Sequence, residues 1–527
     1  MAKKLLFFIF ALGVFFSLSA EAVANDKITK EFFGFDFWFK DIRIWQDVIE
    51  QMDKDSLNFG LVGYEFPWEK IEPDPPQKGA HSYDWSLADK FAQVVAHSGR
   101  QLDLTILPRN NWATIVPYSK MDEPCCDMSP LKEDKDSNAS AWGMTAYEAW
   151  GEFVFNLVER YDADGIADAP GITRPVIKYL ELGAEPDSKE HFLVYGGSPG
   201  LFDRMLSVTY KYAKKANPDI QIVRGRSNPG HIFDDNPDEK TLRLRRADYL
   251  DFISESFKLG KENFDIFAIN LNDHYTGLFP FVRWLESEMN KHGYVKPFMI
   301  GDARTTLYPR DNDSPAMRIL PPRYPPEFMK ILRDPGHPQY RKNKTIQQAD
   351  EVRHSLCKML VALASGQEAI SLQPVIGPLA HKKEMWQDAG LFDMRIFKQG
   401  KGDSLKSRKP LYFACKQISD MLIGADKDIE IISLGENIFA YKLLNGGKKI
   451  FFLWHEDPFA VDEQGLVRRN QNMTVNLRPF VSSANVRIKH FVIEIDSNFK
   501  PVYPADAVTP AGQITINEMP IAVIEEG

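Results

Sequence analysis

The sequence has few cysteines and no metal-binding spacing. Four cysteines occur among its 527 residues, at positions 125, 126, 357 and 415. Adjacent residues such as Cys125 and Cys126 do not pair with each other without strain, and so few cysteines in a long chain do not form a disulfide framework. Neither a CxxC spacing nor an HxxxH pair occurs, so we predict no structural metal and assign no metal ligands.

Positive charge and nucleotide-binding loops are also lacking. The formal net charge is -9 at pH 7, whereas nucleic-acid partners and anionic membrane surfaces select for clustered positive charge. We therefore expect no nucleic-acid partner. No Gly-rich loop follows the first predicted strand, so no cofactor is implied. The one GxSxG match, at 196–200, does not directly follow a predicted strand as the elbow of α/β esterases does, which leaves that class of enzyme without support.

The one long apolar run lies at the N-terminus. Lys3 and Lys4 precede an apolar stretch over 5–20, and two small-x-small cleavage sites follow before residue 25. This pattern predicts a signal peptide over 1–24, with an uncleaved anchor as the alternative. We expect an exported protein, periplasmic, extracellular or at the cell surface, without stable membrane insertion after cleavage. The sequence does not indicate an oligomeric state.

Aromatic side chains are abundant. They make up 12% of the chain, with 10 Trp, 18 Tyr and 36 Phe. Such residues fill hydrophobic cores, but they are also the side chains that stack on pyranose rings in sugar-binding clefts.

Strand-like and helix-like segments alternate over residues 25–424. Buried strands are predicted at 32–39, 57–63, 102–107, 176–183, 221–224, 266–271, 297–300 and 369–373. Amphipathic helices are predicted at 43–53, 86–98, 145–161, 201–216, 246–259, 280–292, 346–365 and 410–422. Eight such units close best as a (β/α)8 TIM barrel, and a doubly wound open sheet is the alternative.

Two regions depart from this alternation. Residues 425–527 hold short strand candidates separated by turn residues, which predicts a C-terminal all-β sandwich domain. These candidates are 429–434, 438–443, 449–454, 473–477, 486–495, 513–516 and 521–524. Residues 305–348 follow a strand and contain eight prolines. A connection of this length either forms a cleft wall or is a solvated excursion.

The segment 176–186 carries the strongest chemical signal. Alternation along a strand places Glu181 and Glu185 on one face, with Glu185 at the C-terminal end, just before Pro186. Buried carboxylates are costly, and the C-terminal edge of a parallel sheet is where active sites form. The alternative is that both glutamates are salt-bridged to nearby arginines.

The order of motifs resembles the clan-A glycoside hydrolases, especially the xylosidase and iduronidase type and their endoglycanase cousins. Residues 180–186 are similar to the segment that holds the family's acid/base, and 296–302 to the one that holds its nucleophile. The resemblance implies a barrel enzyme acting on a poly- or oligosaccharide. It implies Glu185 as general acid/base and Asp302 as nucleophile or base.

Other segments agree with the family pattern, at 65–73, 83–89, 104–112, 150–161, 264–275, 390–393 and 409–410. They suggest substrate contacts from Glu65, Trp68 and Trp112, and Glu181, Arg304 and Gln373 are further candidates for substrate binding. The resemblance places a Tyr or His near the nucleophile, so Tyr275 or His274, like Arg304, is expected beside Asp302. Trp38 and Trp386 are further stacking candidates, and Asp273 is a reserve carboxylate. Each tryptophan is also a candidate core residue.

Three positions depart from the family pattern. Ala184 replaces the Asn before the acid/base, Gln373 stands where strand eight usually ends in Trp, and Asp302 replaces a Glu. Retaining enzymes hold their carboxyl groups about 5–5.5 Å apart and inverting ones about 6.5–9.5 Å apart. The shorter side chain of Asp302 is compatible with an inverting reaction, because it widens the gap between the two carboxyl groups. It is also compatible with a retaining reaction, if the backbone shifts, or with loss of catalysis.

The resemblance therefore leaves two hypotheses. In a hydrolase, Glu185 must be protonated at rest, with a raised pKa, and Asp302 must be ionised. In a catalytically impaired relative, the protein binds carbohydrate or acts as a scaffold.

Overall fold

The computed structural model describes most of the chain. The described residues are 27–36, 42–120, 128–133, 139–188, 191–272, 274–304, 326–332, 334–373, 390–393, 407–456 and 472–526. The predicted signal peptide, half of the proline-rich stretch, Cys125, Cys126, Trp38, Trp386 and Asp273 lie outside them.

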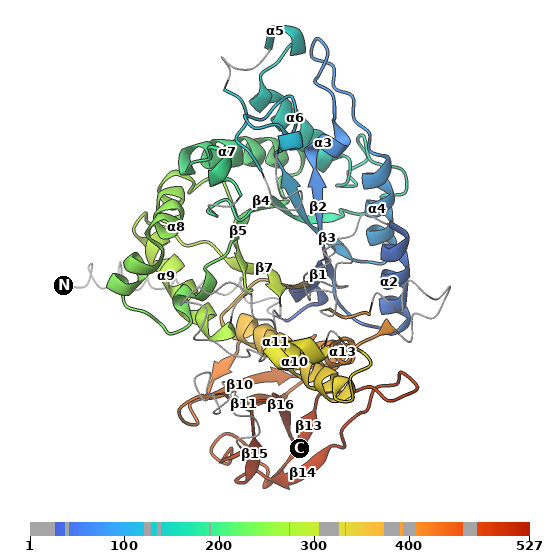
Figure 1. Cartoon of the computed structure of the whole chain (residues 1–527), viewed down its shortest axis with the longest axis vertical. Coiled ribbons are helices and arrows are strands. Elements are labelled where there is room, and N and C mark those ends of the chain that lie inside the picture. The colour runs from blue at the N-terminus through green and yellow to red at the C-terminus, as the bar shows by residue number, and fades with distance from the viewer. Residues whose placement is uncertain are drawn as a thin grey trace, which may run out of the picture.

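Eight parallel strands close into a barrel in chain order, which confirms the predicted fold class (Figure 1). The ring is completed where β8 pairs with β1. The strands are β1 (Phe33–Asp36), β2 (Leu61–Pro67), β3 (Gln101–Leu107), β4 (Ile177–Ala184), β5 (Gln221–Ser227), β6 (Ile266–Asn270), β7 (Phe298–Arg304) and β8 (Ile370–Gln373).

Helices surround the strand ring (Figure 1). They are α2 (Ile42–Lys54), α3 (Trp68–Ile71), α4 (Ser86–His97), α5 (Ala139–Trp142), α6 (Ala146–Glu159), α7 (Pro199–Ala216), α8 (Glu239–Leu259), α9 (Leu278–Asn290), α10 (Pro326–Leu332), α11 (Tyr340–Ala364) and α13 (Pro410–Leu422). Local signals start them: Thr145 and Glu148 form a capping box at α6, and Pro199 opens α7 after Ser198.

The barrel interior is apolar at one end and charged in the middle. The apolar layer contains Leu61, Tyr179, Val223, Ile266, Ala268, Met299 and Ala369. Further toward the strand C-termini, the interior holds Asp36, Asp103, Thr105, Glu181 and Arg226, all buried. Glycines make room for these groups, because a Cβ on Gly63 would lie 2.9 Å from Asp36 Cγ and one on Gly301 would lie 3.0 Å from Arg226 Nε. This charged layer lies directly beneath the mouth of the barrel.

The C-terminal region forms a separate antiparallel β domain. A six-stranded sheet runs in the order β14-β13-β16-β11-β10-β9, and β12 and β15 form a two-stranded sheet. The bounds are β9 (Glu430–Ile431), β10 (Ile438–Asn445), β11 (Lys448–His455), β12 (Met473–Val475), β13 (Asn485–His490), β14 (Ala507–Pro510), β15 (Ile514–Ile516) and β16 (Ile521–Glu525).

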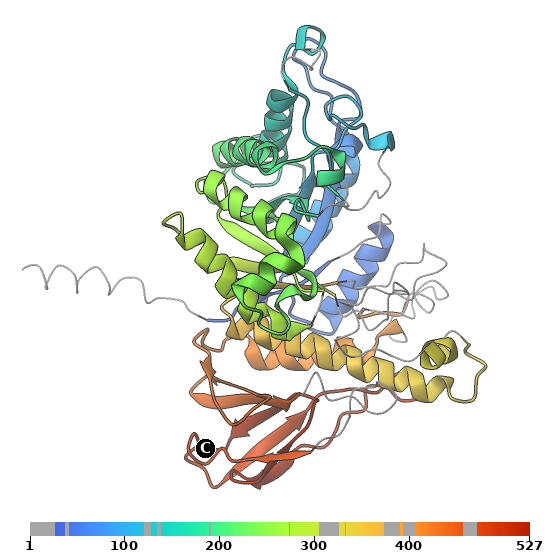
Figure 2. The same cartoon turned by 60° about the vertical axis from the view of Figure 1, so that its left-hand side comes forward.

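Alternation along β11 gives the six-stranded sheet two buried faces. Phe451 and Leu453 join a core with residues of β12 and β15, so the two sheets pack as two layers. Phe452 and Trp454 point the other way and join the core of the barrel. Helices α11 and α13 lie between the strand ring and this sheet (Figure 2). Among the described helices, none is both long enough and apolar enough to span a membrane.

Candidate active site

Glu185 stands at the mouth of the barrel, directly after β4. Its φ of +48° lies in the left-handed region, which costs an ordinary residue roughly 1–2 kcal/mol. Its backbone N–H donates to the carbonyl oxygen of Arg226 on β5 at 2.9 Å. Strained backbone of this kind clusters at functional sites because the surrounding structure must hold it. The strain turns the Glu185 side chain out of the regular alternation of β4.

Three groups surround the Glu185 carboxylate. The amides of Asn270 and Asn228 donate to Oε1 at 2.7 and 3.3 Å. His191 Nε2 lies 3.5 Å from Oε2. The Glu185 side chain keeps 17% of its surface exposed. One carboxylate oxygen is therefore fixed by amides, and the side chain remains reachable from the mouth.

Asp302 lies near the end of β7 and is almost fully covered, with 1% of its side chain exposed. Arg304 Nε contacts Asp302 Oδ2 at 2.9 Å, and Oδ1 is buried with no hydrogen-bond partner among the described residues. The Cα of Asp302 is opposite Asn270 on β6, the residue whose amide holds Glu185. The ends of β4, β6 and β7 therefore bring the two predicted catalytic carboxyl groups to one mouth.

The pKa values of the two carboxyl groups are shifted in opposite directions. Burial raises the pKa of Asp302 to about 6, with Arg304 and Arg226 opposing the shift and the charge of Glu185 adding to it. Burial would also raise the pKa of Glu185, but His191, the Asn270 amide and Arg304 outweigh it, so the pKa is lowered. The expectation of a raised pKa for Glu185 is therefore wrong. At mildly acidic pH the pair holds one proton, which rests on Asp302.

Glu181 has the salt-bridged position that was the alternative to a sugar contact. It is fully buried, its Oε2 lies 2.7 Å from Arg226 Nε, and its Oε1 accepts the Arg226 backbone N–H at 2.8 Å. Thr105 donates to Glu181 and accepts from Arg226, both at 2.8 Å. Arg226 also reaches Asp36 at 3.3 Å. Glu181 thus positions Arg226 below the mouth and has no surface to offer a sugar.

Asp103 is a further carboxyl group in this layer that sequence reasoning missed. It is fully buried, and neither of its oxygens has a hydrogen-bond partner in the part of the chain that the structure describes. Burial, with the charge of Glu181 adding to it, raises the pKa of Asp103 to about 8. Burial therefore favours the neutral form of Asp103, which limits the negative charge beneath Asp302.

The two tryptophans proposed to contact substrate lie in an aromatic core. Trp68 is fully buried, and its indole N–H donates to Glu72 at 2.9 Å. Trp112 is 8% exposed and packs edge-on against Trp68 and Trp142, with centroids 5.0 Å apart in both pairs. Neither ring presents a free face to a sugar, so both occupy the core positions that were the alternative.

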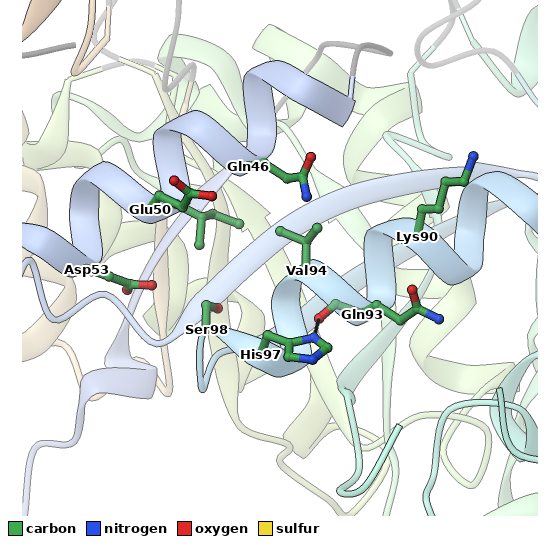
Figure 3. Close-up of a pocket in the computed structure, with 9 residues that line it drawn as sticks. Gln46, Glu50, Asp53, Lys90, Gln93, Val94, His97 and Ser98 are labelled. Carbon is green, nitrogen blue, oxygen red and sulfur yellow. Dashed lines mark hydrogen bonds between the residues drawn. The ribbon is translucent and has the colours of Figure 1, made fainter. Parts of the chain in front are cut away.

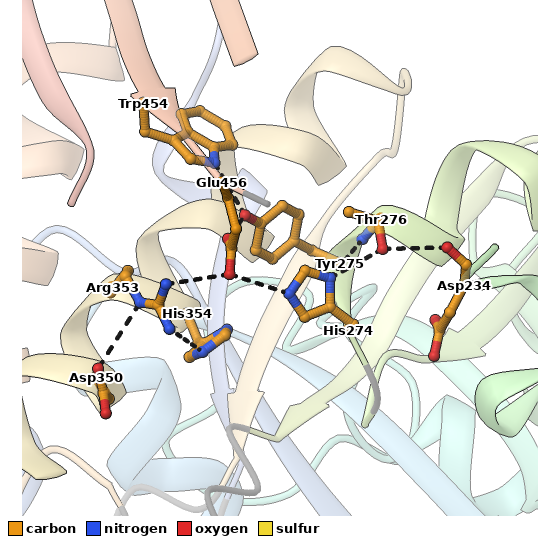
Figure 4. Close-up of polar contacts among 9 residues, drawn as sticks. All are labelled: Asp234, His274, Tyr275, Thr276, Asp350, Arg353, His354, Trp454 and Glu456. Carbon is orange, nitrogen blue, oxygen red and sulfur yellow. Dashed lines mark hydrogen bonds and ion pairs between the residues drawn. The ribbon is translucent and has the colours of Figure 1, made fainter. Parts of the chain in front are cut away.

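His274 and Tyr275 lie at the junction with the β domain (Figure 4). Both are buried, and the Tyr275 hydroxyl donates to Glu456, which follows β11. Trp454 Nε1 donates to the same hydroxyl at 2.9 Å, and Arg353 from α11 reaches Glu456 at 3.1 Å. His274 Nε2 lies 3.4 Å from Glu456. These contacts tie the loop after β6 to the C-terminal sheet, away from the predicted role beside Asp302.

The remaining candidates lie on strand ends at the mouth. Glu65 is half-buried on β2, and its Cα is opposite Thr105 on β3. Gln373 ends β8, with its Cα opposite Arg304. The groups that hold Glu185 were missed, namely Asn228, Asn270 and His191. Asn270 had a detectable signal, because it is the polar residue that ends an apolar strand.

A hollow of about 370 Å³ lies on the outside of the barrel between α2 and α4 (Figure 3). Gln46, Glu50 and Asp53 line it from α2, and Lys90 and His97 from α4. None of the residues at the strand ends contributes to it. The hollow is therefore separate from the carboxyl pair.

No family model and no curated protein sequence matches the chain. Solved structures do. A family 39 glycoside hydrolase from the gut symbiont Bacteroides cellulosilyticus superimposes with a TM-score of 0.55 at 12% identity, covering 96% of this chain and 83% of that one.

Two further solved structures are similar. For a monomeric β-xylosidase from Caulobacter crescentus the TM-score is 0.54 at 10% identity, covering 95% and 97% of the two chains. For a family 86 glycoside hydrolase in complex with neoagarooctaose it is 0.53 at 13% identity, covering 94% and 75%. At these identities the likeness establishes the fold. The chain therefore shares the fold of these solved structures, with a (β/α)8 barrel followed by a C-terminal β domain.

Proposed function

We propose that the protein is an exported glycoside hydrolase that cleaves O-glycosidic bonds of a poly- or oligosaccharide. The observation that carries the proposal is the pair Glu185 and Asp302 at one barrel mouth, with Asn270 and Arg304 beside both. Their contacts come from three different strand ends, and the fold is that of glycoside hydrolases. Export is supported by the apolar N-terminal stretch after Lys3 and Lys4.

Glycoside hydrolysis needs one carboxyl group that donates a proton to the leaving oxygen and one carboxylate that attacks or activates water. A pair that holds one proton supplies both functions. In the proposed roles, Glu185 is the general acid/base, since it is the more exposed group, and Asp302 is the nucleophile or base. The resting proton lies on Asp302, so the reactive form is a minor species in which the proton has moved to Glu185.

The shared proton predicts an acidic pH optimum. When the pH rises above about 6, the pKa of Asp302, both carboxyl groups are ionised and the pair loses its shared proton. We expect kcat/KM to fall by about 10-fold per pH unit there, whichever group carries the proton at rest. A pH profile of kcat/KM on the best substrate measures this limb.

Arg304 offers a control for the origin of that limb. Burial is the largest effect on both pKa values, and the charge of Arg304 lowers both. In Arg304→Gln the limb should therefore move to higher pH. A limb that stays in place, or that moves to lower pH, contradicts its assignment to this pair.

Carbohydrate binding without turnover is the second candidate function. It is favoured by the almost complete burial of Asp302 under Arg304 and by Ala184 in place of the family's Asn. A panel of xylans, glucans and agarose, with their oligosaccharides, separates the two. The hydrolase releases new reducing ends from at least one member. Binding in affinity electrophoresis with no release from any member would favour the second candidate.

A further inference from the structure

A histidine lies between two glutamates in the connection between α3 and α4. His81 Nδ1 is 2.6 Å from Glu72 Oε1, and His81 Nε2 is 3.1 Å from Glu152 Oε2 on α6. The His81 side chain is 9% exposed, the Glu72 side chain is fully buried, and the Glu152 side chain is 44% exposed. Each ring nitrogen therefore faces a carboxylate.

This arrangement suits a His81 ring that carries a proton on both nitrogens. A neutral imidazole has one N–H group and one lone pair, whereas the imidazolium has two N–H groups and a positive charge. Glu72 Oε1 is in hydrogen-bond geometry with Nδ1, while Glu152 Oε2 lies out of line with Nε2 and acts on the ring as an ion pair. With one proton on the ring, a lone pair would face one of the two carboxylates.

The groups around the ring favour the charged state. Glu72 Oε2 accepts from the Trp68 indole N–H at 2.9 Å, which helps to keep this carboxylate ionised. Tyr83 stacks on the His81 ring with centroids 5.1 Å apart, and burial raises the pKa of Tyr83, so its hydroxyl stays neutral. Burial lowers the pKa of His81, but the hydrogen bond and charge of Glu72 and the charge of Glu152 outweigh it, so the pKa is raised.

The contact joins a long connection to α6 on the side of the barrel where β2 ends (Figure 1). The connection, residues 72–85, is also held by bonds that do not titrate. Gly79 donates its N–H to the carbonyl oxygen of Trp142 at 2.7 Å, and the Asn110 amide donates to the carbonyl oxygen of Glu72 at 2.9 Å. The ion pair of His81 with Glu152 is therefore a pH-sensitive link added to a pH-insensitive frame.

We propose that His81 is a pH-dependent clasp that fastens residues 72–85 to α6 while its ring is charged. At higher pH the ring releases the Nε2 proton to solvent and keeps the Nδ1 proton for the buried Glu72. The Nε2 lone pair then faces Glu152, the contact becomes repulsive, and the part-exposed Glu152 side chain turns to solvent. Since β2 ends at the barrel mouth, the order of the chain on that side of the mouth depends on pH. The clasp is independent of the proposed hydrolase activity.

The direction of the pH effect follows from the charge states. A histidine whose pKa is raised by folding stabilises the folded state below its ordinary pKa of 6.5, and this stabilisation is lost as the pH rises through the raised value. Burial also raises the pKa of Glu72, so the clasp opens again in acid when Glu72 takes up a proton. The clasp is therefore closed near pH 6 and open at pH 9.

Hydrogen exchange of the peptide 72–85 in the full chain, followed by mass spectrometry, tests the clasp. Protection factors remove the intrinsic pH dependence of exchange and report local opening. In the wild type, protection of this peptide should be about 3–5-fold lower at pH 9 than at pH 6, the range for one partly exposed ion pair. In Glu152→Gln, protection at pH 6 should already have the lower value, and it should not fall further at pH 9. His81→Gln should likewise remove the pH dependence.

Glu255→Gln is the matched control. Glu255 on α8 is 46% exposed and lies 3.6 Å from Lys258, a cation that stays charged at both pH values. This variant should leave the protection of 72–85 as in the wild type at pH 6 and at pH 9. Wild-type protection that is the same at the two pH values overturns the clasp. So does a Glu152→Gln or His81→Gln variant that keeps the wild-type pH dependence.

Discussion

Glu185→Gln is expected to lower kcat/KM by about 10²–10⁴-fold or more, the range for loss of a positioned acid or base. The change is nearly isosteric, and the new amide oxygen still accepts from Asn270, which donates to Oε1 at 2.7 Å in the wild type. Binding of carbohydrate should persist, because only the ability to carry and transfer a proton is lost. Initial rates on the best member of the glycan panel measure the effect.

Glu288→Gln is the matched control for that experiment. Glu288 is also a buried glutamate, 8% exposed on α9, and it accepts a hydrogen bond from Ser254 at 2.9 Å. It lies on the outer helical layer, so its substitution should leave kcat/KM within about 3-fold of the wild type. A loss of less than 10-fold for Glu185→Gln, or a similar loss in both variants, would remove Glu185 from the chemistry.

Arg226→Met is expected to destabilise the folded protein by about 3–5 kcal/mol at pH 7, the cost of breaking a buried ion pair from one side. Arg226 contacts Glu181 at 2.7 Å and Asp36 at 3.3 Å, and its charge also acts on Asp103 and Asp302. Without it, these buried carboxylates lose their cation. Urea unfolding followed by near-ultraviolet circular dichroism measures the change.

The sign of the pH dependence of the stability loss in Arg226→Met distinguishes removal of a cation from buried carboxylates from a simple packing defect. A carboxyl group whose pKa is raised by folding binds more protons in the folded state, so stability increases as pH falls through that pKa. The defect in Arg226→Met should therefore be smaller at pH 5 than at pH 7. Arg245→Met removes a partly exposed partner of Asp235 and should cost about 1 kcal/mol or less. Equal costs for the two variants, or a pH-independent defect, would contradict the charge network.

The architecture was predictable because buried parallel strands read as continuous apolar runs. Each of the eight predicted barrel strands overlaps an observed one, and β3, β6 and β8 each differ by a single residue at one end. β14 in the C-terminal domain was missed. Three of its four residues are exposed and it ends in Pro510, so it carries no apolar pattern.

The site was only partly predictable. Strand ends identified Glu185 and Asp302 as residues of one mouth, but the sequence does not reveal what surrounds each carboxyl group. The low pKa of Glu185 depends on His191 and Asn270, which come from other loops and strands. Likewise, alternation along β4 placed Glu181 inside the barrel, but only the closed ring shows that Arg226 meets it there.

Long-range contacts explain the reassigned aromatic residues. Tyr275 follows β6, where the family pattern suggested a neighbour of Asp302. Its hydroxyl is held instead by Glu456 and Trp454, about 180 residues later in the chain. Trp68 is covered by Trp112, Trp150 and Phe153, which belong to segments after β3 and to α6. Neither set of contacts produces a pattern in the neighbouring sequence that could have predicted it.

The most direct test of the carboxyl pair is a double-mutant comparison of kcat/KM for Glu185→Gln, Asp302→Asn and the combined variant. Groups that act as one unit are strongly non-additive, because removing either already removes the joint function. The account predicts that the combined variant is within about 3-fold of the slower single variant. A combined loss equal to the product of the two single losses would mean that Glu185 and Asp302 act separately, and would contradict a shared site at the barrel mouth.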